Sequence, residues 1–155
     1  MRIHILSRET WLPIDRATAF DFFCSPFNLE RITPPELSFN VVDAPEGEVE
    51  DGVEIGYRLH LWGLRFRWRS LICDWEPGIA FTDQALISPY RFWHHNHRLI
   101  DQNGGTLMLD RVQYALPLYP VGEIAHFMVR RQLKRIFDYR EKTIQEIFAP
   151  DSQND

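Results

Sequence analysis

Between residues 38 and 116, apolar and polar residues alternate in short runs, which is the pattern of strands buried on one face. Proline, glycine and asparagine separate the runs, so we expect consecutive strands to pair in antiparallel fashion. A strand at residues 2–12 precedes them, which gives a predicted sheet of about seven strands. The other six strands are predicted at residues 38–43, 53–62, 64–75, 79–86, 90–100 and 106–116.

Two short helices are predicted between the first strand and the others. Asp15 is suited to cap the first helix, and Phe20 belongs to its apolar face. Ser25 is suited to cap the second helix, because Pro26 then takes the first helical position. Thr33-Pro34-Pro35 ends the second helix before the main run of strands begins.

A single long helix is predicted at residues 121–148, where no helix breaker follows Pro120. We expect the sheet to wrap around this helix and to leave a cavity between them, in an α+β fold that forms one domain over residues 1–149. The polar residues 150–155 are predicted to be a disordered tail. The apolar stripe of the helix consists of Ile124, Met128, Leu133, Ile136, Phe137, Ile144 and Ile147.

Composition excludes several classes of protein. The 155 residues carry a net charge of -5, so the molecule as a whole has no attraction for nucleic acid. No apolar run is long enough for a transmembrane segment, and the first residues lack a signal peptide, so we expect a soluble cytoplasmic protein. Cys24 and Cys73 lack metal or redox spacing and are expected to be reduced thiols.

The most informative segment is a predicted hairpin around Asn103-Gly104, a pair that favours a two-residue type I′ turn. This turn sets the register, and one face then carries histidines, a carboxylate and large aromatic rings. We interpret this face as the wall of a pocket; a purely structural histidine–aspartate pair and a slipped register are the alternatives. The predicted pairs are His97 with Asp110, His95 with Val112, Trp93 with Tyr114, and Leu99 with Met108.

The same alternation identifies the inward-facing residues on the other strands and on the long helix. Each aromatic ring taken singly fits core packing, but the whole set resembles a pocket with apolar walls and a few converging polar groups. The predicted ligand-binding residues are Tyr57, Trp68, Phe81, Trp93, His95, His97, Met108, Asp110, Tyr114, Leu133, Ile136 and Phe137.

The element order β-α-α-β6-α resembles the helix-grip fold of the START/Bet v 1-like (SRPBCC) superfamily, over nearly the whole chain. Within it, the chain is most similar to short bacterial cyclase/dehydrase-like or ligand-binding members, some relatives of which are known as cell-division inhibitors. Ser88 departs from the glycine that is common there before Pro89. The motifs that carry the resemblance are Pro13 before Phe20 and Phe22-Phe23, Pro26-x-Asn28-Leu29, Thr33-Pro34-Pro35, Trp75-x-Pro77, Phe81-x-Asp83-Gln84, Pro89-Tyr90 before Trp93-x-His95-x-His97, and Gly104-Gly105-Thr106 before Asp110 and Tyr114.

This resemblance implies a fold and a cavity for an apolar ligand. It does not imply one reaction, because the superfamily includes lipid carriers, binders of hormones and secondary metabolites, aromatase/cyclases and oxygenase subunits. We therefore expect binding of a hydrophobic small molecule, such as a lipid, a polyketide-like or an aromatic compound, between the sheet and the C-terminal helix.

An enzyme of the polyketide cyclase/dehydratase type is the first alternative. His95 or His97, oriented by Asp110, would supply the acid-base chemistry, although the sequence places no nucleophile beside them. The same three residues form a two-histidine, one-carboxylate set. In a metal site, carboxylates next to the ligands usually orient them, but aromatic residues adjoin this set instead. We therefore expect neither a metal nor a cofactor.

A regulatory interaction module is the second alternative. Four basic residues lie close together on the long helix and can form either a solvated face or a contact surface for a protein or an anionic membrane. They are Arg130, Arg131, Lys134 and Arg135.

Overall fold

The computed structural model describes residues 1–149, so the predicted disordered tail lies outside the described residues. The order of elements agrees with the prediction, with two additional 3₁₀ turns. The elements are β1 (His4–Leu12), α1 (Arg16–Cys24), α2 (Pro26–Arg31), η1 (Pro35–Leu37), β2 (Asn40–Asp43), β3 (Glu54–Leu61), β4 (Leu64–Glu76), β5 (Ala80–Ile87), β6 (Phe92–Gln102), β7 (Gly105–Ala115), η2 (Val121–Ala125) and α3 (His126–Ile147).

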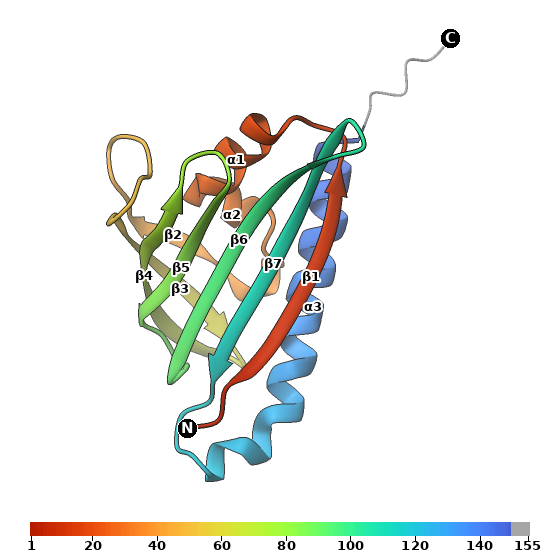
Figure 1. Ribbon diagram of the computed structural model, residues 1–155. Helices are drawn as coiled ribbons and strands as arrows, with labels where there is room; N and C mark the ends of the chain where they lie inside the picture. Colours follow the sequence, from red (N-terminus) through yellow and green to blue (C-terminus); the bar gives the residue numbers. More distant parts are fainter. Residues whose placement is uncertain (150–155) are drawn as a thin grey trace.

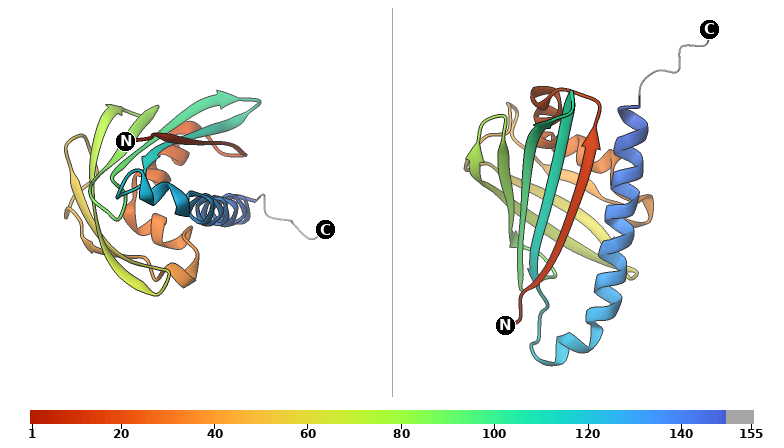
Figure 2. Two further views of the ribbon diagram at one scale, coloured as in Figure 1. Left: turned by 90° about the horizontal axis from the view of Figure 1, so that it is seen from below. Right: turned by 45° about the vertical axis from the view of Figure 1, so that its right-hand side comes forward.

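The predicted antiparallel sheet of seven strands is confirmed, in the order β1-β7-β6-β5-β4-β3-β2. Within the described residues all neighbouring strands pair antiparallel, and the only pair there that is not consecutive in the chain is β1 with β7. Figure 1 shows the long helix α3 packed along the sheet, and Figure 2 shows the sheet curving around it, with α1 and α2 closing one end. This curvature places the inner faces of β3 to β7 toward α3.

The register of the β6–β7 hairpin is the predicted one. Asn103 and Gly104 both have positive φ, at 51° and 74°, as a type I′ turn requires. His97 pairs with Asp110, and the other three predicted pairs are also present. The buried residues of β6 alternate with half-buried ones, so the histidine face of the hairpin points into the molecule.

The helix prediction needs two corrections near Pro120. The first turn is 3₁₀ rather than α-helical, because the backbone N–H of Glu123 donates to the carbonyl oxygen of Pro120, three residues earlier. The predicted stripe is also wrong at Ile124 and Met128, whose side chains are exposed. Arg140 takes a buried place on the stripe instead.

Local contacts fix the remaining helices. Asp15 takes the N-cap position of α1, but its side chain makes no capping hydrogen bond; the backbone of Ala19 donates to its carbonyl oxygen. Phe20 packs edge-on against Trp75 and Phe81, which attaches α1 to the sheet. Within residues 1–149 no helix has the length and apolar character needed to cross a membrane.

Candidate functional site

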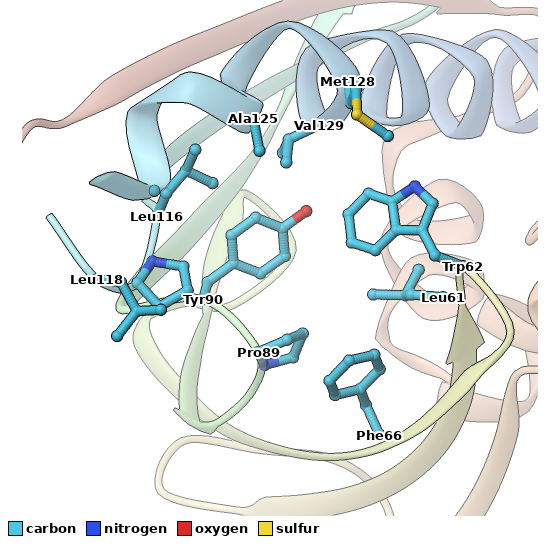
Figure 3. A pocket seen from close by; sticks show the side chains of 12 residues that line it. Leu61, Trp62, Phe66, Pro89, Tyr90, Leu116, Leu118, Ala125, Met128 and Val129 are labelled. Atoms are coloured by element: carbon cyan, nitrogen blue, oxygen red, sulfur yellow. The ribbon is translucent and has the colours of Figure 1, made fainter. Parts of the chain in front are cut away.

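The roomiest apolar space lies at the end of the sheet where α3 begins, and we call it the outer chamber. It has a volume of about 390 Å³ and is formed by the β3–β4 turn, the β5–β6 loop and the segment from the end of β7 to the first turn of α3 (Figure 3). A surface hollow beside α1 and α2 is about 440 Å³, but Asp21 and Glu48 are among its lining residues. The lining of the outer chamber includes Leu61, Trp62, Phe66, Tyr90, Leu116 and Val129.

Tyr90 supplies a hydroxyl group to this apolar space. Figure 3 shows the hydroxyl oxygen pointing into the chamber, between Trp62 and Val129. Burial raises the pKa of Tyr90, so the group stays protonated at neutral pH and is able to donate and accept hydrogen bonds. Contacts with Trp68 and Trp93 hold the ring in place.

Two smaller spaces continue from the outer chamber toward the centre of the molecule. The middle chamber has about 100 Å³ and shares Leu61 and Tyr90 with the outer one. The inner chamber has about 40 Å³ and shares His95 and Arg140 with the middle one. The three spaces therefore adjoin one another in a series from the end of the sheet to the histidine face of the hairpin, and we call this series the path.

The predicted ligand-binding residues gather in the two smaller chambers and not in the outer one. Met108, Asp110 and Tyr114 line none of the three chambers: Met108 packs in the core with Leu99, and the hydroxyl group of Tyr114 lies 3.1 Å from Nε2 of His126. Nine of the twelve predicted residues do line the path. Tyr57, Trp68, Trp93, His95, Leu133, Ile136 and Phe137 line the middle chamber, and Phe81 and His97, with Tyr57 and His95 again, line the inner one.

Asp110 lies directly behind the two histidines. Its Oδ1 is 2.7 Å from Nε2 of His95 and 3.1 Å from Nδ1 of His97, and all three side chains are buried. His97 is the backbone partner of Asp110, but the shorter side-chain contact comes from His95, two residues earlier on the same face. The ring of Phe81 stacks on His97 with 4.5 Å between the ring centres.

Burial decides the protonation of this cluster. It lowers the pKa of His95 to about 3, with help from neighbouring His97 and against the attraction of Asp110. Burial alone would raise the pKa of Asp110, but the hydrogen bond from His95 and the close contact of His97 outweigh it and lower this pKa below its usual range. A neutral His95 therefore donates its Nε2–H to an ionised Asp110 at neutral pH.

Comparisons with known proteins bear on the fold. No protein-family model matches the chain, and no curated protein matches it significantly. Among solved structures, ZhuI aromatase/cyclase from Streptomyces sp. R1128 is similar at 11% identity and a TM-score of 0.71, over 96% of this chain and 98% of that chain. Major latex-like protein 151 from Panax ginseng is similar at 12% identity and a TM-score of 0.65, over 96% and 99%.

The chain has the predicted helix-grip fold, which it shares with these two proteins and with Ara h 8.0201. Another similar structure is the nucleoside-diphosphate sugar epimerase from Corynebacterium glutamicum, at 26% identity and a TM-score of 0.62. The match covers 91% of this chain but only 28% of that longer chain. The helix-grip fold is therefore also found as one part of a larger protein.

Arg140 is a site residue of this helix-grip structure that the sequence analysis missed. Its Nη1 lies 3.9 Å from Oδ1 of Asp110, and its guanidinium group lies 5.0 Å from the ring centre of Phe137. Nε of Arg140 and Oδ1 of Asp83 are buried without a hydrogen-bond partner among the described residues. The spacing of Arg140 after Leu133 and Phe137 was a signal, because it puts a charge on the buried stripe.

In the described part of the chain, two groups of side chains have the spacing of metal ligands, with donor atoms within 4.8 Å of one another. In the group of His95, His97 and Asp110, the nearby positive charge of Arg140 opposes a cation. The second group is His4, Glu123 and His126, which is half-buried. Its members already contact one another, because Nε2 of His4 lies 2.8 Å from Oε2 of Glu123 and its ring stacks on that of His126.

The four basic residues predicted to form a face of α3 divide into two pairs. Lys134 contacts Asp138, and Arg135 contacts Glu36 on η1. Arg130 and Arg131 are exposed at the end of α3 nearest the outer chamber. A partner surface formed by all four basic residues stays a prediction.

Proposed function

We propose that this protein binds a hydrophobic small molecule, with most of the ligand in the outer chamber. The observation that carries the proposal is an apolar chamber of about 390 Å³, which is the size of a small-molecule site. Tyr90 supplies the polar group that would orient a ligand within it. The helix-grip fold shared with an aromatase/cyclase supports an apolar or polyketide-like ligand.

The structure changes where this ligand is proposed to lie. The predicted site was the histidine face, but the two chambers there have only about 100 and 40 Å³. A narrow end of the ligand would enter the middle chamber, while its bulk stays beside α3. The proposed binding residues are therefore Leu116, Tyr90 and Val129 first, and the predicted set around Trp93 second.

A fluorescent apolar probe, N-phenyl-1-naphthylamine, tests the proposal. We expect saturable binding with a negative heat-capacity change, which is the mark of buried apolar surface. Ala125→Trp adds an indole ring at an exposed lining position, so it should weaken probe binding at least about tenfold without disturbing the core. Gln145→Trp, at an exposed position further along α3, is the matched control.

Two results would reject this ligand site. One is an absence of probe binding by the unsubstituted protein. The other is equal affinity in Ala125→Trp and Gln145→Trp. Native mass spectrometry of the purified protein would show the mass of any apolar compound that it retains.

A cyclase/dehydratase reaction is the second candidate, because His95 contacts Asp110 and lines two chambers. A pKa of about 3 makes His95 a weak base, so substrate binding would have to raise it. His95→Gln, His97→Gln and Asp110→Asn should each abolish turnover of a polyketide-like carbonyl substrate and leave probe binding largely intact. Unchanged turnover in His95→Gln would eliminate this candidate.

A regulatory role through the basic face of α3 and a cytoplasmic location stay predictions. Cys24 and Cys73 are both free thiols, which fits a reducing compartment. Burial raises the pKa of Cys24 to about 12, so this thiol is kept from forming a reactive thiolate.

A further inference from the structure

The segment around η2 exposes an unusual amount of apolar surface. Six large apolar side chains between residues 118 and 128 have exposed fractions of 47% to 82%. Figure 1 shows η2 and the first turns of α3 projecting beyond the end of the sheet. A contiguous exposed patch of this kind marks an interaction site on most proteins. The six residues are Leu118, Tyr119, Val121, Ile124, Phe127 and Met128.

The β3–β4 turn supplies the opposite side of the same patch. Trp62 and Leu64 are exposed there, and Trp62 lines the outer chamber together with Leu118 and Met128 (Figure 3). These two residues and the six above form what we call the apolar rim. The outer chamber opens within the rim, so whatever covers the rim also covers the chamber.

Charge around the rim is positive, although the chain as a whole has a net charge of -5. Arg130 and Arg131 are exposed directly after the rim residues of α3, and Arg91 is exposed next to Tyr90 of the chamber. The only acidic residue between positions 117 and 131 is Glu123. Its carboxylate contacts His4 and is largely buried, so it does not offset the arginines at the surface.

We infer that the apolar rim docks on an anionic lipid surface. Apolar side chains enter the boundary of the acyl chains, and exposed arginines near that depth are attracted to anionic headgroups. Trp62 and Tyr119 are the aromatic types that favour this boundary, because each has an apolar ring and a polar atom. The docked face is an edge of the molecule, and no helix within residues 1–149 is long and apolar enough to cross the bilayer.

The position of the chamber favours lipid over a protein partner, a step that rests on the proposed function. A protein seated on the rim would close the chamber, whereas a lipid surface would let an apolar ligand pass between bilayer and chamber without crossing water. Docking itself requires only the rim and the arginines. It can therefore be measured on protein that carries no ligand.

Vesicle flotation tests the inference. Ligand-free protein should float with vesicles of phosphatidylglycerol and phosphatidylcholine and much less with phosphatidylcholine alone, and the difference should shrink at high salt. Ile124→Ser/Phe127→Ser should weaken partitioning at least about tenfold, because two exposed anchors are lost. Val42→Ser/Ile100→Ser removes two exposed apolar side chains outside the rim and should leave partitioning unchanged.

Three outcomes would overturn docking on lipid. The first is an absence of flotation, and the second is an equal loss of vesicle partitioning in both double variants. The third is a dimer in sedimentation that Ile124→Ser/Phe127→Ser dissociates, because the rim would then be a contact between copies of this chain. Circular dichroism should show that both double variants are folded. Probe binding without vesicles is scored separately, so failure of the ligand site and failure of the docking surface give different results.

Discussion

Replacing Asp110 by asparagine keeps the shape of the buried cluster but removes its negative charge. Arg140 then keeps a positive charge that is 8% exposed, with Nη1 3.9 Å from the altered group. At this separation two unit charges interact by about 4 kcal/mol when the effective dielectric constant is about 20. Asparagine can still accept a hydrogen bond from His95, so the main interaction lost is the attraction between the charge of Asp110 and that of Arg140.

We expect Asp110→Asn to lower the free energy of unfolding by about 3 kcal/mol, the lower end for breaking a buried ion pair. Asp83 also lies near Arg140 and limits the loss by keeping one negative charge close to it. For a chain of this length the melting temperature should fall by about 6–12 °C. The protein should stay folded at room temperature, because domains have about 5–15 kcal/mol of stability.

Urea unfolding followed by circular dichroism measures this loss. Adding Arg140→Met to Asp110→Asn removes the stranded charge, so the double variant should be more stable than Asp110→Asn by about 1–3 kcal/mol. An unchanged urea midpoint in Asp110→Asn would refute the argument. So would a double variant that is no more stable than Asp110→Asn.

Two further predictions concern pH and backbone packing. The pKa of His95 is about 3 in the folded chain, so between pH 6.5 and about 4.5 the unfolded chain binds a proton at His95 that the folded chain excludes. The free energy of unfolding should therefore fall by up to about 1.4 kcal/mol for each pH unit by which the pH decreases. His95→Gln should reduce this slope in urea titrations, and an unchanged slope would contradict the pKa assignment. An added Cβ on Gly105 would collide with the carbonyl oxygen of Leu12, so Gly105→Ala should cost about 1–3 kcal/mol in calorimetry, whereas Gly47→Ala, with open space around it, should cost less than about 0.5 kcal/mol. Equal melting temperatures for the two alanine variants would show that the strand relaxes.

The hairpin shows why much of the fold was predictable from sequence. The pair Asn103-Gly104 admits positive φ at both positions, which fixes which residues face each other along β6 and β7. Alternation along each strand then selects the inward face. Local chemistry therefore determined both the sheet and the position of the histidine face.

The outer chamber was not predictable in the same way. Much of its lining comes from turns and loops, such as Trp62 and Pro89, where no periodicity marks a buried face. The buried Arg140 was missed because a charged residue on an apolar stripe is ordinarily assigned to solvent. Its placement follows from the buried negative charge of Asp110, which only the three-dimensional structure brings near it.

The pairing of β1 with β7 has a consequence for how the chain folds. β1 is synthesised before the other strands of the sheet, yet its partners lie about a hundred residues later, at 106–114. The hairpins of β3 to β7 pair strands that are close in the sequence, so the entropy cost of closing the loop between them is much smaller than for β1 and β7. We expect β1 to remain unpaired on the ribosome until most of the chain has emerged, and its amides to gain protection from hydrogen exchange after those of the β3–β4 hairpin. The sheet would then be completed by the one of its seven strands that is synthesised before the others.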